Sequence, residues 1–261
     1  MKTPAEKVSI GDFARQIRDQ MIPAGNRFSY FVVALQLSDE DIREYLDEPI
    51  ASLPPKLRAL IPEVRILLTP FLESGPAKCQ AENHAEDLVC FEKPAAKRQI
   101  WSSRLAAGQD NVLAFALKDQ DVADYHYRFF RELAVLAAGA VGSGVHDKFS
   151  DIVREELSAG THGEVDEQSW QLKQALLRRQ RNVRRKTKGF AAYARQAFID
   201  TTALYLHGIC CDIDVDPGPR QLASRHIRRR LELLRALFPP PEGYAVFPEE
   251  LNHAEETPPA S

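Results

Sequence analysis

The chain changes its pattern of apolar residues near residue 120, and this change constrains the fold more than any other feature. Before it, short runs are rich in aromatic and β-branched residues, which is typical of strands. After it, apolar residues recur at the 3.6-residue spacing of helices through five successive segments. Strand signals followed by helix signals indicate the α+β class. We expect a small antiparallel sheet with short helices in the first half and a bundle of about five helices in the second.

The first 118 residues contain four strand candidates. The strongest is residues 28–37, and the others are residues 64–72, 87–91 and 111–117. Short amphipathic helices are expected at residues 9–21 and from Ser38 towards Leu46. Ser9 and Ser38 are the first residues of these two segments, and each can accept hydrogen bonds from the first turn, which is the role of a helix N-cap.

The second half contains five helix candidates, at residues 121–141, 146–159, 167–188, 190–207 and 221–238. Leu172, Leu176 and Val183 form the apolar stripe of the third. The fourth carries few charges, which indicates the centre of a bundle. We therefore expect a sheet-bearing region at residues 1–118, a basic helical region at 119–241 and a mobile C-terminal tail at 242–261.

Composition and targeting signals favour a cytoplasmic protein with no membrane span. Of the 261 residues, 44% are hydrophobic and 27% are charged, which is close to the average for globular chains. The longest uncharged apolar stretch, residues 133–145, is shorter than the ~20 residues that a spanning helix needs. The N-terminal residues are polar and charged, unlike a secretory signal. Two of the four cysteines are adjacent, so reduced thiols are expected.

Charge is distributed unevenly along the chain. The whole chain has a net charge of -3, but residues 171–236 contain 15 Lys and Arg against 5 Asp and Glu, a net charge of +10. The remainder therefore carries -13. Such an asymmetry between segments points to an electrostatic partner, either elsewhere in the same chain or outside it.

A concentrated positive face attracts phosphates and gains free energy from counterion release, so our first hypothesis is a polyanion-binding protein in a binding or regulatory role, with RNA or DNA as the favoured ligand. Arginine dominates the segment and suits bidentate phosphate contacts. The expected nucleic-acid-binding residues are Arg178, Arg181, Arg184, Arg185, Lys188, Arg225, Arg228 and Arg229. Alternatively, the basic helices pack against or lie beside the acidic first half of the chain, and their arginines form a solvated helix face. A third possibility is an interaction module without chemistry, in which the acidic and basic halves neutralise each other or pair between protomers.

Arg220 and His226 are separated by five residues. This spacing resembles the arginine-to-histidine motif of the HEPN family of helical nucleases. The resemblance implies metal-independent RNA cleavage, with His226 moving the proton and Arg220 stabilising the charge that develops on the phosphate. The structural alternative makes His226 a residue on the flank of the last helix, beside Leu222 and Leu233.

Asp212, Asp214 and Asp216 alternate with Ile213 and Val215, so an extended segment would place the three carboxylates on one face. Hard cations such as Mg²⁺ or Ca²⁺ prefer oxygen clusters of this kind, which would suit a metal-dependent phosphohydrolase. Alternatively, the segment is an acidic turn that pairs with Arg220 or Arg225 and caps the next helix. Apart from this possible divalent metal, the sequence predicts no cofactor.

Overall fold

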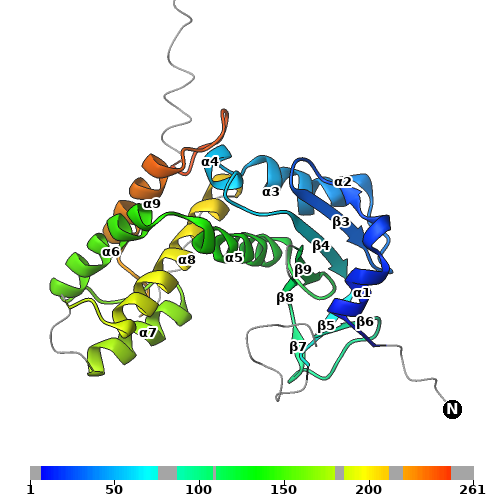
Figure 1. Cartoon of the computed structure of the whole chain (residues 1–261), viewed down its shortest axis with the longest axis horizontal. Coiled ribbons are helices and arrows are strands. Elements are labelled where there is room, and N and C mark those ends of the chain that lie inside the picture. Colours follow the sequence, from blue (N-terminus) through cyan, green and yellow to red (C-terminus); the bar gives the residue numbers. More distant parts are fainter. Residues whose placement is uncertain (1–6, 76–86, 108–109, 180–184, 212–219, 248–261) are drawn as a thin grey trace, which may run out of the picture. The chain divides into compact units, whose positions relative to one another are not determined.

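The computed structural model describes residues 7–75, 87–107, 110–179, 185–211 and 220–247 (Figure 1). The chain divides into two compact units. Unit 1 comprises Met1–Ile50 and Ile61–Arg128, and unit 2 comprises Ala51–Leu60 and Phe129–Ser261. The predicted α+β class is confirmed, because strands and short helices occupy the first half and the long helices α5 to α9 occupy the second.

Unit 1 contains a five-stranded mixed sheet. Its strands lie in the order β2 (Ile22–Pro23), β3 (Phe28–Val32), β4 (Val64–Thr69), β9 (Asp110–Ala116) and β8 (Ser102–Ala107). The central strands β3, β4 and β9 are parallel, and the two outer strands run antiparallel to their neighbours. This parallel ladder was not predicted. Its sequence signature is the continuous apolar character of β4 and β9, whose residues are mostly buried on both faces.

The predicted antiparallel sheet is also present in unit 1. Its strands lie in the order β1 (Val8–Ser9), β6 (Leu88–Cys90), β5 (Phe71–Glu73) and β7 (Gln99–Ile100). The single strand expected at residues 64–72 is divided between the two sheets. Pro70 stands between β4 and β5, where its missing N–H interrupts the ladder.

The helices of unit 1 are short. They are α1 (Ile10–Gln16), the 3₁₀ turn η1 (Arg18–Gln20), α2 (Asp39–Ile42), the π-helical turn η2 (Arg43–Asp47) and α3 (Glu48–Ala51). Both predicted caps are confirmed: the Ser9 hydroxyl accepts from the Asp12 N–H, and Ser38 forms a capping box with Asp41. The core of the unit includes Ile10, Leu67, Leu72, Val89 and Val112, contributed by α1 and both sheets.

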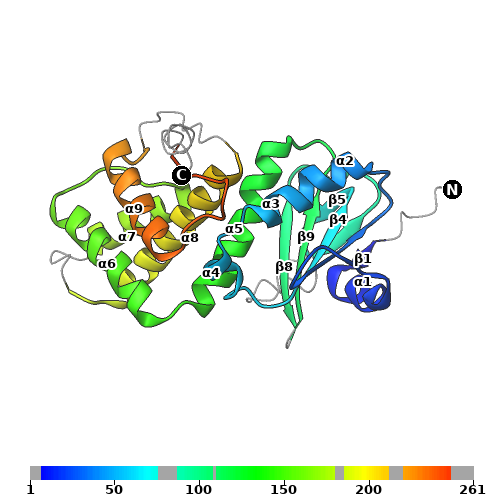
Figure 2. The same cartoon turned by 90° about the horizontal axis from the view of Figure 1, so that it is seen from above.

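Unit 2 is helical. It contains α4 (Pro55–Arg58), α6 (Ser143–Ser158), α7 (Glu167–Arg179), α8 (Lys188–Cys210) and α9 (Ser224–Leu237), and it takes all but the first turns of α5 (Val122–Ala140). Helix α8 lies among α6, α7 and α9 and is buried along most of its length (Figure 2). The predicted central helix is therefore confirmed. None of the helices in the described part of the chain is long and apolar enough to cross a membrane.

The end of unit 2 after α9 is described as far as Phe247, and residues 248–261 of the predicted mobile tail lie outside the described residues. Val246 and Phe247 are buried. The ring of Phe247 lies with its centroid 4.6 Å from the guanidinium carbon of Arg228. This segment therefore packs on α9.

Candidate functional site

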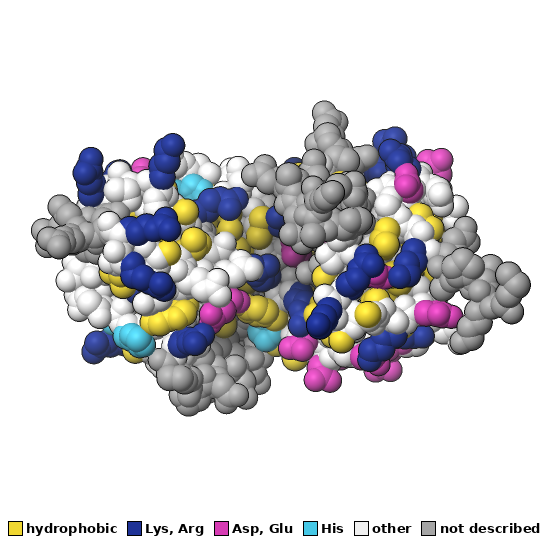
Figure 3. Space-filling view, turned by 90° about the horizontal axis from the view of Figure 1, so that it is seen from below, with side chains coloured by type: hydrophobic (Ala, Val, Ile, Leu, Met, Phe, Trp, Pro, Cys, Tyr) yellow, Lys and Arg dark blue, Asp and Glu magenta, His cyan; other side chains and the backbone are white. Residues whose placement is uncertain are grey.

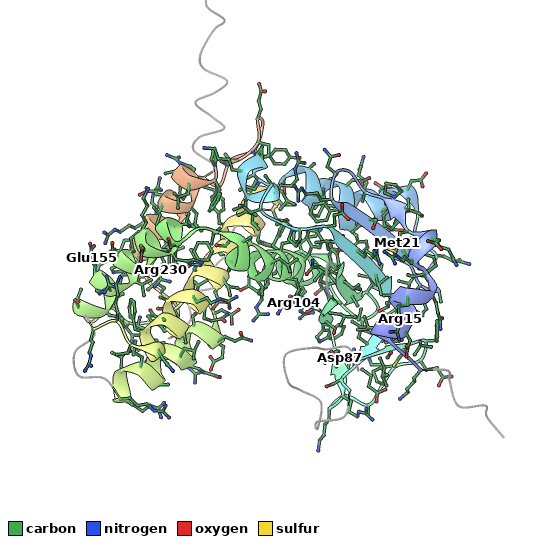
Figure 4. The ribbon with its side chains drawn as sticks, viewed as in Figure 1. Arg15, Met21, Asp87, Arg104, Glu155 and Arg230 are labelled. Carbon is green, nitrogen blue, oxygen red and sulfur yellow. The ribbon has the colours of Figure 1, made fainter. Side chains whose placement is uncertain are left out.

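A buried ion network occupies the interior of unit 2. Arg230 of α9 is fully buried, with its Nη1 2.9 Å from Glu164 Oε2 and its Nε 3.1 Å from Glu156 Oε2. Lys173 of α7 donates to Glu164 Oε1 at 3.2 Å, and the Tyr193 hydroxyl of α8 donates to the same carboxylate. Two cations thus face two carboxylates. Figure 4 shows Arg230 inside the helical unit.

Within this network, the neighbouring charges oppose the effect of burial on the pKa values of Glu164 and Lys173. Burial alone would raise the pKa of Glu164, but the charges of Arg230 and Lys173 outweigh burial and lower that pKa below its usual range. Burial lowers the pKa of Lys173, and Glu164 opposes this effect. Because each charge already has a buried counterion, the network ties α9 to α6 and α7 and leaves no charge for a ligand.

The exposed arginines of α9 also contact protein groups. Arg229 is paired with Glu155 on α6, which lies at the edge of the unit in Figure 4. Arg228 Nε lies 3.2 Å from Glu232 Oε1. Arg225 Nε donates to His226 Nε2 at 3.2 Å. Of the three α9 residues in the predicted nucleic-acid-binding set, Arg228 and Arg229 therefore already form ion pairs with carboxylates of the chain.

A different arrangement is found on the surface formed by α7, α8 and residues 185–187, which we call the basic hairpin. Arg178, Arg179, Lys188 and Arg195 are exposed, and within the described ranges none of them forms an ion pair. Arg185 is exposed as well. Arg181 and Arg184, which also belong to the predicted nucleic-acid-binding set, lie outside the described residues. Lys186 Nζ lies 3.8 Å from Asp147 Oδ1.

Acidic residues are nearly absent from this segment. Residues 168–211 contain nine Lys and Arg but one Asp or Glu, Asp200. Asp200 is fully buried, and burial, together with the nearby Asp166, raises its pKa to about 6. Its Oδ1 accepts from Gln196 Nε2 at 2.7 Å. On the surface of unit 2 at the left of Figure 3, Lys and Arg side chains clearly outnumber Asp and Glu.

A cleft of about 250 Å³ lies at the other end of α7. It is lined by Glu164, Val165, Asp166, Glu167, Trp170, Arg220 and Gln221. Its wall is built by a parallel bridge between Glu164 and Gln221. Gly163 makes this approach possible, because its φ is +81° and a Cβ there would lie 2.2 Å from the Gln221 carbonyl oxygen.

The two predicted catalytic residues have separate partners. Arg220 precedes α9 and lines the cleft, with its Nη1 2.9 Å from Glu167 Oε2. His226 lies in the first turn of α9, with its Nδ1 3.7 Å from Glu156 Oε1 and 17% of its side chain exposed. The described lining of the cleft includes Arg220 and not His226. The predicted metal ligands Asp212, Asp214 and Asp216 lie outside the described residues.

Comparisons with known proteins add no family to this description. No protein-family model, curated protein or solved structure matches the chain. The candidate site is therefore defined by its own geometry.

Sequence reasoning missed three residues that organise this region: Glu164, Lys173 and Trp170. Lys173 carried a signal, because it lies four residues after Ser169 and three before Leu176, and all three are buried on one face of α7. A lysine on an inner helix face indicates a buried acid. In the predicted stripe, Leu176 is buried, Leu172 is half-buried and Val183 lies outside the described residues. Trp170 belonged to no motif.

Proposed function

We propose that this is a cytosolic protein that binds a polyanion, RNA or DNA, through the basic hairpin, in a binding or regulatory role. The observation that supports it is the set of exposed cations without carboxylate partners in the described structure, Arg178, Arg179, Lys188 and Arg195. They lie in a segment whose one acid is buried. Phosphates would supply the negative charge that these residues do not receive from the chain.

The physical basis is electrostatic. Each phosphate neutralised by Lys or Arg releases condensed counterions, so affinity falls steeply as salt increases. The planar guanidinium fork binds two phosphate oxygens at once, which favours arginine over lysine. This proposal involves fewer residues than the hypothesis drawn from the sequence. We propose that the described hairpin residues form the centre of the interface, and that the α9 arginines mainly stabilise the fold.

The experiment compares two triple variants with the same change of net charge. The hairpin variant is Arg178→Gln, Arg179→Gln, Lys188→Gln, and the matched control is Arg225→Gln, Arg228→Gln, Arg229→Gln on α9. Fluorescence anisotropy with labelled RNA and DNA oligonucleotides is measured across a range of salt concentrations. For the hairpin variant we expect weaker binding and a salt slope that is shallower by roughly 0.7–0.9 for each phosphate that the variant no longer neutralises.

The control variant should keep most of the affinity. Equal losses in both variants would show that only the total charge matters, and the hairpin would not be the interface. Wild-type protein with no salt-sensitive affinity for any oligonucleotide would remove the proposed function altogether.

A further inference from the structure

One face of α7 connects the cleft with the basic hairpin. At 100° per residue, Trp170, Gln174, Leu177 and Arg178 fall within an arc of about 100°. Trp170 lines the cleft, Leu177 is 44% exposed and Arg178 is exposed at the far end of the helix. Arg178 lies eight positions after Trp170, or about 12 Å along the helix axis. Aromatic, apolar and cationic side chains thus follow one another along a single stripe, which is half-buried at Trp170 and Gln174 and exposed at Leu177 and Arg178.

The carboxylates that line the cleft are already engaged by protein groups. Glu164 belongs to the buried network and Glu167 is paired with Arg220. Asp166 caps α7, because its Oδ1 accepts from the Gln168 N–H at 3.3 Å. The cleft is also lined by Trp170, whose ring already lies edge-to-face with that of His162, with the two ring centroids 4.9 Å apart.

Arg220 provides the polar side of the cleft. Its side chain is 64% exposed, and one of its terminal nitrogens contacts Glu167. A guanidinium has five N–H donors in a planar fork, so this ion pair leaves donors that can reach a phosphate. A flat apolar ring beside an exposed guanidinium matches one nucleotide, with the base on the ring and the phosphate at the rim.

We propose that the cleft binds one unpaired nucleobase stacked on Trp170, with Arg220 at the adjoining phosphate, and that the polyanion held by the basic hairpin is therefore single-stranded. This inference rests on the proposed function. Aromatic side chains stack on the bases of single strands because such bases can be splayed out, whereas bases within a duplex are stacked on one another.

The first test uses tryptophan fluorescence. The chain has two tryptophans, so Trp101→Phe leaves Trp170 as the single reporter. Titration of this variant with single-stranded RNA, single-stranded DNA and duplexes of the same sequence should change Trp170 emission with either single strand, and much less with the duplexes. An oligonucleotide that binds by anisotropy while Trp170 emission stays constant would overturn the inference.

The second test separates stacking from folding. Trp170→Phe keeps an aromatic face, whereas Trp170→Leu keeps only apolar bulk, and circular dichroism shows whether each variant is folded. For folded Trp170→Leu we expect roughly 5- to 100-fold weaker binding of single strands, with Trp170→Phe losing much less and duplex binding unchanged. Equal losses of affinity for single strands and duplexes, or no loss for either, would contradict the stacking of a base on Trp170.

A third measurement distinguishes failure of this inference from failure of the proposed function. A free nucleoside monophosphate can enter the cleft without contacting the hairpin, so it should change Trp170 emission in the Trp101→Phe protein and also in the hairpin triple variant. If oligonucleotides bind but neither the monophosphate nor single strands change Trp170 emission, base binding in the cleft is excluded and the proposed function stands. A monophosphate response without any oligonucleotide binding removes the proposed function instead.

Discussion

Helix α9 and the basic hairpin are both rich in arginine, but they use it differently. On α9, Arg230 is buried between Glu156 and Glu164, and Arg229 is paired with Glu155. On the hairpin, Arg178 and Arg179 are exposed, and no carboxylate in the described part of the chain pairs with either. The difference shows that an arginine-rich sequence can mix residues that hold the fold with residues that face solvent. The position of the acids, and not the number of cations, separates the two groups.

The largest expected effect concerns the buried arginine of α9. Arg230→Met should lower the free energy of unfolding by about 3–5 kcal/mol, because Glu156 and Glu164 would be left buried without their cation. Urea denaturation measures this loss. Arg229→Gln, which removes an exposed ion pair on the same helix, should cost less than about 1 kcal/mol. Similar losses for both variants would break the distinction between structural and surface arginines.

A smaller loss of stability is expected from a change at Gly163, the residue that precedes Glu164 of the buried network. Gly163→Ala should destabilise unit 2 by about 1–3 kcal/mol, because the residue has a positive φ and its Cβ would collide with the Gln221 carbonyl. The control is Gly144→Ala in α6, where a Cβ meets no atom within 4 Å. Thermal melts of both variants test the expectation, and equal melting temperatures would argue against the tight approach.

Asp200, the one acidic residue between residues 168 and 211, predicts a pH dependence. The pKa of Asp200 is raised from 3.8 to about 6, so the folded state binds this proton more tightly than the unfolded state does. Its stability contribution is greatest at low pH and is lost as pH rises through about 6. Asp200→Asn should therefore stabilise the protein by about 1–3 kcal/mol at pH 8 and by little at pH 4. Urea denaturation at both pH values measures the difference, and a stabilisation independent of pH would show that Asp200 does not titrate in this way.

The smallest effect is expected on the hairpin surface. Single Gln substitutions at Arg178, Arg179 and Lys188 should each change the free energy of unfolding by less than about 0.5 kcal/mol, because no carboxylate pairs with these side chains among the residues described. Chemical denaturation checks each variant. A loss of more than about 1 kcal/mol would place the residue with the structural arginines of α9.

Much of the fold follows from local sequence patterns. The five long helices, the caps at Ser9 and Ser38, and the buried centre of α8 were predicted from periodicity and capping chemistry. The parallel ladder of β3, β4 and β9 was missed because strand direction depends on how distant segments pair. Strand β8 was missed as well. It is the antiparallel partner of β9, and this pairing was not recognised because no strand was expected at residues 102–107.

The candidate site was less predictable than the fold. The excess of positive charge could be counted from the sequence, but the acids that bind Arg230 lie 66 and 74 residues away from it. Only the packing of α6, α7 and α9 around α8 brings them together. The same holds for Trp170 and Arg220, which line one cleft from separate parts of the chain.

The interleaved division of the chain has a consequence for its synthesis. Ala51–Leu60 belongs to unit 2, but the chain then returns to unit 1 until Arg128. A nascent chain that has emerged as far as Arg128 contains all of unit 1, yet Leu53 and Leu57, which are buried in the finished protein, still lack the remainder of unit 2. Because N-terminal domains tend to fold first, we expect these two leucines to gain their full packing only after the later helices have been synthesised.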